Sequence, residues 1–398
     1  MTKLEELIKE LCPNGVHFFS IENLIKQSYV CTITPSIKIK RSDYLQAGST
    51  PIVSQEEEYI SGYCDIVDDS IPFANYVCFG DHSEHIKYVN FSFVQGADGL
   101  KIMTTQESQI NSRYFYHACS CYYVRHNNYE RHFKYFCDTV IPVPPIPVQE
   151  EIVRILDSFT ELTAELTAEL TARKKQYEYY RDRVIDLESI GYQKIKLGEI
   201  CDVRDGTHDS PKAVPKGKYL ITSKNIKNGT VDYLGAYFIS EEDYNKINYR
   251  SKVDVWDILF TMIGTIGEIG LITFEPDFAI KNVGLIKTHD ELLARFLRHY
   301  LLSEQAKKYI KENQSKGSQS FLALGKLRDL PVPLISKKRM EFLVQVLDKF
   351  DSICSDLKIG LPAEIEARTK QYEYYRDKLL SFKETPTYEQ KKEISKTE

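Results

Sequence analysis

An internal duplication constrains the fold of this chain more than any other feature. The heptapeptide QYEYYRD occurs at residues 176–182 and again, letter for letter, at 371–377, which is 195 residues later. Two upstream segments match in the same order: VRILDSF with VQVLDKF (153–159 and 344–350), and IPVP with LPVP (141–144 and 330–333). A period of about 190 residues is far longer than the unit of a repeat array. The sequence therefore predicts two copies of one domain.

Each half contains the same succession of segments. A mixed region rich in Gly, Tyr, Asn and β-branched residues leads into a proline-rich exit, which is expected to be extended because proline fixes φ and lacks an N–H donor. A long helical pattern follows, with apolar residues at heptad spacing such as Ile152, Phe159 and Leu166 in the first half. The matching stripes predict that the two helices pair with each other. The alternative, in which each helix packs only on its own domain, stays open.

These patterns predict an α+β fold with two similar mixed α/β domains and two long helices. The expected boundaries are an N-terminal helical segment at 1–16, a first domain at 17–147, a first helix at 148–189, a second domain at 190–334, a second helix at 335–383 and a flexible tail at 384–398. In the first helix, TAEL occurs twice in tandem at 163–170. Ala, Glu and Leu favour helix, and one four-residue unit adds about 6 Å, just over one turn. We therefore interpret the repeat as a length-setting element.

Composition and charge argue against a membrane protein, a secreted protein and a protein that binds nucleic acid by charge alone. Apolar runs fall short of the ~20 residues of a membrane helix, and the charged N-terminus MTKLEELIKELC lacks a signal-peptide core. Nine cysteines in a chain of this length fit reduced thiols, so we expect a soluble cytoplasmic protein with no membrane partner. The net charge is −5, and residues 17–140 carry 10 Lys and Arg against 14 Asp and Glu. Binding to nucleic acid by bulk charge alone is therefore not indicated.

The arrangement resembles the specificity (S) subunit of type I restriction–modification systems over nearly the whole chain. The resemblance is carried by the duplicated QYEYYRD, by the TAEL repeat and by two segments of the second domain. These are KLGEICDVRDGTH at 196–208, which is similar to the usual opening of that domain, and DILFTMIGTIGEIG at 257–270, which is similar to its glycine-rich hairpin. The first domain has looser counterparts, CFGDH at 78–82 and GADGL at 96–100.

The resemblance implies two target-recognition domains that each read one half of an asymmetric, bipartite double-stranded DNA target. It also implies that the two helices run antiparallel as a coiled-coil spacer, with pseudo-twofold symmetry between the halves. Two modification subunits, which bind S-adenosylmethionine and methylate adenine, would dock on the helices, and restriction subunits would use ATP and Mg²⁺. No cofactor is expected on this chain, and TAEL copy number would set the length of the unread spacer.

The sequence offers no catalytic site of its own. It lacks a phosphate-binding loop and the D/N-P-P-Y/F signature of adenine methylation, and Gly264, Gly267 and Gly270 fit a strand–turn–strand better than a dinucleotide site. One candidate metal constellation combines His117, Cys119, Cys121, His126, His132 and Cys137. Its C-x-C spacing does not match a zinc finger, so we expect no metal site. No catalytic residue is predicted.

Base reading requires amides and guanidinium groups, and phosphate binding requires lysines and hydroxyls. In the first domain the candidates are Lys38, Lys40, Arg41, Gln55, His82, His85, Arg125, His126, Asn127 and Arg131. In the second domain they are Thr207, His208, Lys224, Asn225, Lys227, Asn228, Lys281, Asn282, Lys316, Ser318 and Gln319. For each of them, a solvated loop position is the competing interpretation.

The QYEYYRD copies supply candidate docking residues. Tyr177 and Tyr180 lie on the apolar stripe and predict inter-helix packing. Tyr179, Arg181, Tyr374 and Arg376 lie off it and are candidates for partner docking, because Tyr and Arg are enriched at interface hot spots.

The alternative function is a coiled-coil adaptor whose duplicated domains bind protein instead of DNA. The bases recognised cannot be derived from the sequence.

Overall fold

The computed structural model describes residues 2–66, 68–96, 98–189, 191–227, 229–315, 320–355 and 360–385. The chain divides into two compact units, one formed by Met1–Glu165 with Glu366–Glu398 and the other by Leu166–Ile365. Each unit is therefore built from both halves of the duplication. Among the described helices, none combines the length and the apolar character that a membrane span would need.

The first unit contains one mixed α/β domain and parts of two long helices, α5 and α12. Its elements are α1 (Lys3–Leu11), β1 (His17–Ser20), α2 (Ile21–Lys26), β2 (Val30–Ile33), β3 (Lys38–Ile39), the 3-10 turn η1 (Arg41–Asp43), β4 (Thr50–Val53), β5 (Gly62–Cys64), β6 (Tyr76–Gly80), β7 (Ile86–Val89), β8 (Val94–Gly96), β9 (Leu100–Thr105), α3 (Ser112–Tyr122), α4 (Phe133–Asp138), β10 (Val140–Val143) and the start of α5 (Ile146–Ser189).

The strands of the first unit form three sheets. The order β2-β9-β6-β7 makes an antiparallel sheet, and β3-β8-β4-β5 makes a mixed sheet in which β8 is parallel to both β3 and β4. A third pair, β1 with β10, joins the beginning of the domain to its proline-rich exit. The apolar face of the antiparallel sheet and helix α3 share one core that includes Val77, Phe79, Met103 and Phe115.

The second unit repeats this plan. Its elements are β11 (Lys194–Lys196), α6 (Leu197–Ile200), β12 (Asp202–Asp205), β13 (Lys218–Ile221), the 3-10 turn η2 (Ser223–Asn225), β14 (Ile226–Lys227), β15 (Thr230–Val231), β16 (Tyr237–Ile239), α7 (Glu241–Ser251), β17 (Ile258–Thr261), β18 (Ile269–Leu271), β19 (Phe278–Ile280), β20 (Val283–Lys287), α8 (Glu291–Leu301), α9 (Glu304–Asn313), α10 (Leu324–Arg328), β21 (Pro331–Pro333), α11 (Lys337–Ser355) and the start of α12 (Leu361–Leu380).

The sheets of the two units largely correspond, except that β3 has no counterpart and β14 pairs with β15 in a separate two-stranded sheet. The order β12-β20-β17-β18 matches the antiparallel sheet of the first unit, and β16-β13-β19 matches three strands of its mixed sheet, with one antiparallel and one parallel pair. Strands β11 and β21 close the second domain as β1 and β10 close the first. The glycine-rich segment forms the hairpin β17–β18, as the sequence predicts. The duplicated mixed α/β fold is therefore confirmed.

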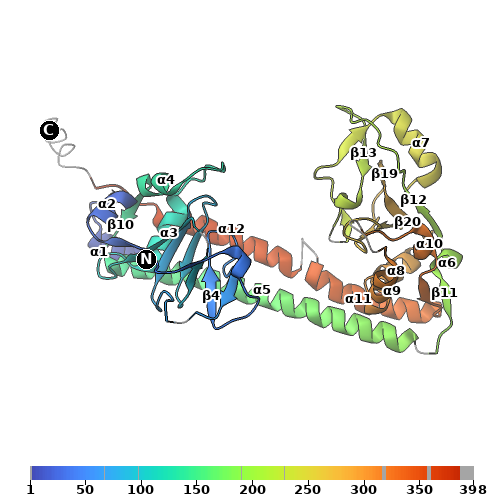
Figure 1. Cartoon of the computed structure of the whole chain (residues 1–398), viewed down its shortest axis with the longest axis horizontal. Helices are drawn as coiled ribbons and strands as arrows, with labels where there is room; N and C mark the ends of the chain where they lie inside the picture. Colours follow the sequence, from blue (N-terminus) through green and yellow to red (C-terminus); the bar gives the residue numbers. More distant parts are fainter. Residues whose placement is uncertain are drawn as a thin grey trace. The chain divides into compact units, whose positions relative to one another are not determined.

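Helix α5 is continuous over 44 residues, so the TAEL repeat is helical throughout (Figure 1). In the first unit, Phe159 of α5 stacks on Tyr375 of α12, with ring centroids 5.3 Å apart. In the second unit, Tyr180 of α5 stacks on Phe350 of α11 at 5.9 Å. In each unit, α5 therefore packs against a helix from the second half of the sequence. The helices thus pair with each other and also pack on the domains.

A buried histidine joins each domain to its helix pair. In the first unit, His117 of α3 lies between Asp157 of α5, at 3.1 Å from Nε2, and Tyr372 of α12, at 3.0 Å from Nδ1. We call His117, Asp157 and Tyr372 the first His network. A neutral imidazole fits these partners, because Nε2–H donates to the carboxylate and Nδ1 accepts from the tyrosine hydroxyl. The Arg113 guanidinium donates to the same carboxylate at 2.8 Å.

The second unit contains the same arrangement. His299 of α8 lies between Asp348 of α11, at 2.6 Å from Nε2, and Tyr177 of α5, at 2.8 Å from Nδ1. These three residues form the second His network, and Arg295 pairs with its carboxylate. Each network therefore binds the first tyrosine of the QYEYYRD copy that belongs to the opposite half of the sequence. Tyr177 shares a buried apolar cluster with Leu347 of α11, in keeping with packing between helices, and its hydroxyl also bonds to His299 of the second domain.

Replacing Tyr177 with Phe will destabilise the second unit. The substitution keeps the ring but leaves the buried His299 Nδ1 without its donor, at a cost of about 1–3 kcal/mol. Urea unfolding followed by the fluorescence of the one tryptophan, Trp256, measures this loss in the unit that contains it. The control Tyr179→Phe changes an exposed ring and should stay within about 0.5 kcal/mol of the unsubstituted chain. Equal effects of the two substitutions would contradict a structural role for the network.

Acidification will weaken the fold through the buried histidines. Burial lowers the pKa of His117 and His299, so the folded chain keeps them neutral while the unfolded chain takes up protons near 6.5. Their contribution is thus present above pH 6.5 and is lost as the pH falls below it. Burial would raise the pKa of Asp348, but the hydrogen bond from His299 holds it below 3.8, so the carboxylate loses its contribution only in stronger acid.

The corresponding measurement is the free energy of unfolding at about pH 7.5 and about pH 5.5, with Trp256 as the probe. The unsubstituted chain should be less stable at the lower pH. His299→Gln keeps a hydrogen-bonding side chain without a titrating ring, and the difference between the two pH values should shrink. An unchanged difference would show that other groups cause the pH dependence.

Candidate nucleic-acid interface

Six predicted residues of the first domain lie together on two adjoining loops. His82 and His85 follow β6, and Arg125, His126, Asn127 and Arg131 lie in the exposed segment between α3 and α4. His82 stacks on Tyr129 at 5.2 Å, and Arg125 Nη2 lies 3.3 Å from His85 Nδ1. We call these six residues and Tyr129 the histidine surface. Its imidazole, guanidinium and amide groups are of the kind that reads DNA.

The buried carboxylate of Glu84 holds the histidine surface in place. Glu84 accepts hydrogen bonds from the backbone N–H groups of His126 and Asn127, at 2.8 and 2.7 Å, and from the Tyr123 hydroxyl at 2.6 Å. Burial alone would raise the pKa of Glu84, but these hydrogen bonds keep it below its usual value. His126 also stacks on Tyr135 at 4.3 Å. The loop is therefore anchored from beneath while its outer side chains remain exposed.

The other predicted residues of the first domain have different roles. Lys38 pairs with Asp98 at 2.8 Å, and Arg41 pairs with Glu56 at 2.6 Å. Lys40 is exposed beside them. Gln55 Oε1 accepts from the backbone N–H of His82 at 3.1 Å, and its side chain packs against Gly99. Gln55 thus supports the loop that carries His82, because its amide oxygen is engaged by the backbone of that loop.

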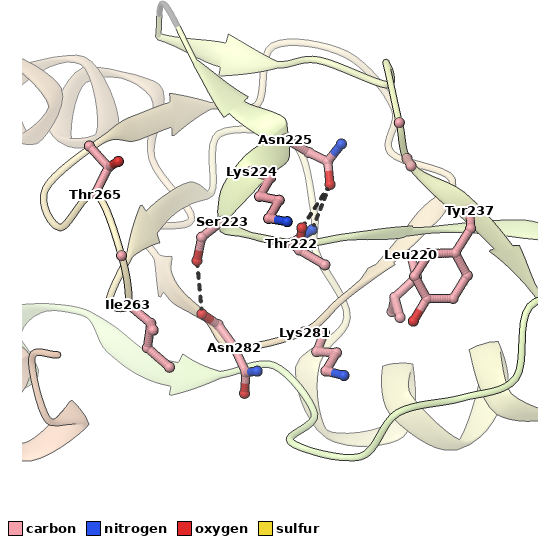
Figure 2. Close-up of a pocket in the computed structure, with 13 residues that line it drawn as sticks. Leu220, Thr222, Ser223, Lys224, Asn225, Tyr237, Ile263, Thr265, Lys281 and Asn282 are labelled. Atoms are coloured by element: carbon pink, nitrogen blue, oxygen red, sulfur yellow. Dashed lines mark hydrogen bonds between the residues drawn. The ribbon is translucent and has the colours of Figure 1, made fainter. Parts of the chain in front are cut away.

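In the second domain, predicted residues meet at a cavity of about 570 Å³. Figure 2 shows Lys224 from η2 and Lys281 with Asn282 from the turn between β19 and β20 around it. We call this site the lysine cavity; its lining also includes the hydroxyls of Thr222, Ser223 and Thr265.

The charge of the lysine cavity is distinctive. Its described lining holds two lysines and no carboxylate, whereas a neighbouring cavity beside α7 is lined by Asp205, Asp209 and Asp243 as well as by basic residues. Gly264 at its rim has a φ of +79° and open space where a side chain would project. An anionic backbone could approach such a site closely, because lysines and hydroxyls are the usual phosphate ligands.

Thr207 and His208 lie beside the lysine cavity. The backbone oxygen of Thr207 accepts from the N–H of Asn282 at 3.1 Å, and His208 Nδ1 lies 2.8 Å from Asn282 Oδ1. Lys227, at the neighbouring hairpin, has Nζ 3.9 Å from an Asp232 carboxylate oxygen.

Asn225 also lines the lysine cavity, but it is buried. Its amide bonds to Thr222, Asp232 and Leu234, so it shapes the η2 turn. Asn228, Lys316, Ser318 and Gln319 lie outside the described residues. Their predicted role stays a prediction.

The candidate docking residues separate into exposed and buried positions. Tyr179 and Tyr374 are 56% and 61% exposed. Arg181 is 3% exposed, because it packs over the Tyr177 ring and pairs with Asp182. Arg376 is half-buried against Asp377. The two tyrosines are thus the part of this set that offers free surface, and Arg181 is used inside its own unit.

The residues of the candidate metal constellation have other partners. His117 belongs to the first His network, Cys121 Sγ lies 3.5 Å from Asp377, and His132 Nε2 lies 3.0 Å from the Asn128 carbonyl. Over the described part of the chain, no group of three or more His, Cys, Asp and Glu is placed to hold a metal ion.

Sequence reasoning missed Tyr129 and Thr265. Tyr129 is 91% exposed on the histidine surface, and Thr265 lines the lysine cavity. The signal for Tyr129 was available, since an aromatic residue inside the polar run RHNNYER has no apolar neighbours in sequence with which to form a core.

Two stretches of the chain, residues 24–173 and 189–367, match the family described as type I restriction modification DNA specificity domain. The specificity subunit of the type I restriction enzyme EcoR124I/EcoR124II from Escherichia coli is 26% identical over 370 residues, which cover 88% of this chain and 91% of that protein. A Mycoplasma pneumoniae protein named as a type I specificity subunit is 33% identical over 264 residues, covering 61% of this chain and 72% of its own length.

Solved structures support the same fold. The crystal structure of a type I restriction–modification S subunit from M. genitalium superimposes with a TM-score of 0.52 at 15% identity, covering 92% of this chain and 97% of that one. A chain from a structural study of type I restriction–modification complex assembly and conformational transition gives 0.53 at 14% identity, covering 92% and 98%.

Removing the two cationic groups of the lysine cavity should weaken binding of duplex DNA by the full-length chain. We expect Lys224→Ala combined with Lys281→Ala to lower affinity for all sequences and to reduce the slope of log K against log salt by about two. Lys246→Ala, in the neighbouring cavity with carboxylates, is the matched control and should leave the slope unchanged. Titrations at several salt concentrations measure both quantities. An unchanged slope in the double variant would show that the cavity does not face phosphate.

Proposed function

The chain belongs to the type I restriction–modification DNA specificity family, and on that premise we propose that each of its two domains reads one half of a bipartite, asymmetric DNA target. The observation that carries this proposal is the pair of different polar surfaces on matching sheet frames. The histidine surface offers imidazole, guanidinium and amide groups, and the lysine cavity offers ammonium, hydroxyl and amide groups. Different surfaces on one frame fit two different half-targets.

The paired helices fit the role of a spacer. Helix α5 contributes to both units and passes through the TAEL repeat without a break. The hydroxyls of Thr163 and Thr171 donate to backbone carbonyls four residues earlier, at 2.9 and 3.0 Å. The hydrogen-bonding needs of these side chains are therefore met within the helix. A four-residue change in such a helix alters its length by about 6 Å and leaves its facing nearly unchanged.

The chemistry would be performed by other subunits. We propose that two modification subunits dock on the helices, with Tyr179 and Tyr374 as part of the docking surface, and that they bind S-adenosylmethionine. Restriction subunits would bind ATP and Mg²⁺, and the assembly would act in the cytoplasm. The exposure of both tyrosines supports this role, since they occupy equivalent places in the two QYEYYRD copies and large exposed aromatic side chains are frequent interface anchors.

A change in TAEL copy number tests the proposal. Inserting a third TAEL after residue 170 should lengthen the unread spacer by on the order of one to two base pairs, because about 6 Å of helix compares with a base-pair rise of about 3.4 Å. The measurement is the map of methylated adenines produced by the chain together with its modification subunit. As a control, replacing the existing TAEL at 167–170 by AAEL keeps the length and should keep the spacer. An altered half-target, or an unaltered spacer, would contradict the proposal.

A further inference from the structure

Asn282 occupies a constrained position at the lysine cavity. Its φ is +53°, in the left-handed region, and it immediately precedes the central strand β20. In the first unit the equivalent position, immediately before β9, is Gly99 with a φ of +105°. Glycine adopts this region freely, whereas a residue with a side chain does so at some cost, although Asn tolerates it better than most. The side chain of Asn282 therefore merits a functional explanation.

The backbone of Asn282 is fixed on both sides. Its N–H donates to the Thr207 carbonyl at 3.1 Å. Its carbonyl accepts from the Ser223 hydroxyl at 3.3 Å, a bond shown in Figure 2. These bonds join the β19–β20 turn to the segment after β12 and to η2. The amide of Asn282 is thus carried by a backbone with little freedom, which is what a side chain that must meet a base edge requires.

A chain of hydrogen bonds reaches Asn282 from the domain interior. Asp205 is buried and pairs with Arg250, and its Oδ2 lies 2.9 Å from His208 Nε2. The other ring nitrogen, Nδ1, lies 2.8 Å from Asn282 Oδ1. A carboxylate accepts, so Nε2 carries a proton, and the state of Nδ1 then decides which end of the amide faces the ring.

The bond to His208 decides which end of the Asn282 amide faces outward. If His208 is neutral, Nδ1 accepts from the amide NH₂ and the amide oxygen faces away as an acceptor. If His208 is charged, Nδ1–H donates to the amide oxygen and the NH₂ faces away as a donor. In both states the end of the amide that faces His208 is engaged by the ring, and the opposite end is the one presented outward.

The surroundings of this amide favour DNA. Lys281 and Lys224 line the same cavity, and no carboxylate is found in its described lining. Asp205, which pairs with Arg250, meets the other ring nitrogen of His208, and Asp209, Asp243 and Lys246 line the adjoining cavity. Asp205 and Asn282 thus meet opposite nitrogens of the ring, and the Lys281 ammonium donates to the Ser210 hydroxyl.

We propose that Asn282 reads a base-pair edge in the half-target of the second domain through the end of its amide that faces outward, and that His208 is the positioning residue that selects this end. The inference rests on the proposed function and deepens it by naming a specificity-determining residue. A donor facing outward would pair with the acceptors of guanine or thymine, and an acceptor would pair with the amino group of adenine or cytosine.

The test is selection from a pool of randomised DNA duplexes by the full-length chain bound to its modification subunit, followed by sequencing. The unsubstituted chain should select a bipartite motif. Asn282→Ala should reduce the base preference at one position of one half by at least about fivefold, with every other position within about twofold. His208→Ala lets either end of the amide turn outward, so the preference at the same position should relax to bases that present donors as well as to bases that present acceptors. Asn245→Ala, an exposed amide on α7, is the matched control and should leave the motif intact.

The possible failures are distinguishable. If the unsubstituted chain selects no motif, the proposed function itself is overturned. If it selects a motif and Asn282→Ala leaves every position unchanged, the role of Asn282 is overturned while the proposed function stands. If Asn282→Ala erases the whole half-target while thermal unfolding is unchanged, Asn282 shapes the loop instead of reading a base, and the inference is again overturned. If His208→Ala shifts no base preference, His208 does not position the amide.

Discussion

Each unit depends on one fully buried imidazole that bonds to both long helices at once. His117 joins Asp157 of α5 to Tyr372 of α12, and His299 joins Asp348 of α11 to Tyr177 of α5. A buried polar group that loses a partner is costly, so each histidine fixes a domain to a defined turn of two helices. Because the tyrosine and the carboxylate come from opposite halves of the sequence, neither half can complete its own network.

The parts of the molecule that hold the domains in place are the same in both units, and the parts that offer polar surface differ. The His networks, the helix pairs and the sheet order recur in both units, whereas the outer loops differ: one carries the histidine surface and the other the lysine cavity. Gly99 and Asn282 illustrate the principle, since the same left-handed position bears no side chain in one domain and an amide in the other. The recognition surface can therefore change without a change in the frame that holds it.

The sequence was sufficient for the elements that depend on local pattern. The duplication predicted two like domains, the TAEL repeat predicted helix, and the glycines of 257–270 predicted a hairpin, which is β17–β18. The roles of polar loop residues could not be predicted in the same way. Asn225 and Asn282 each follow a lysine in the sequence, and only the tertiary contacts show that Asn225 is buried. The bond from Tyr177 to His299 spans 122 residues, so heptad spacing could not indicate it.

The central claim is that helices from opposite halves of the sequence lie side by side within one chain, and cysteine cross-linking tests it most directly. Phe159 with Tyr375, and Tyr180 with Phe350, would each be replaced by cysteine in a background where the exposed Cys31 is serine, then treated with a short thiol cross-linker and mapped by mass spectrometry. The structure predicts an intrachain cross-link for each pair. Reactive thiols that form no link, or links only between chains, would contradict it.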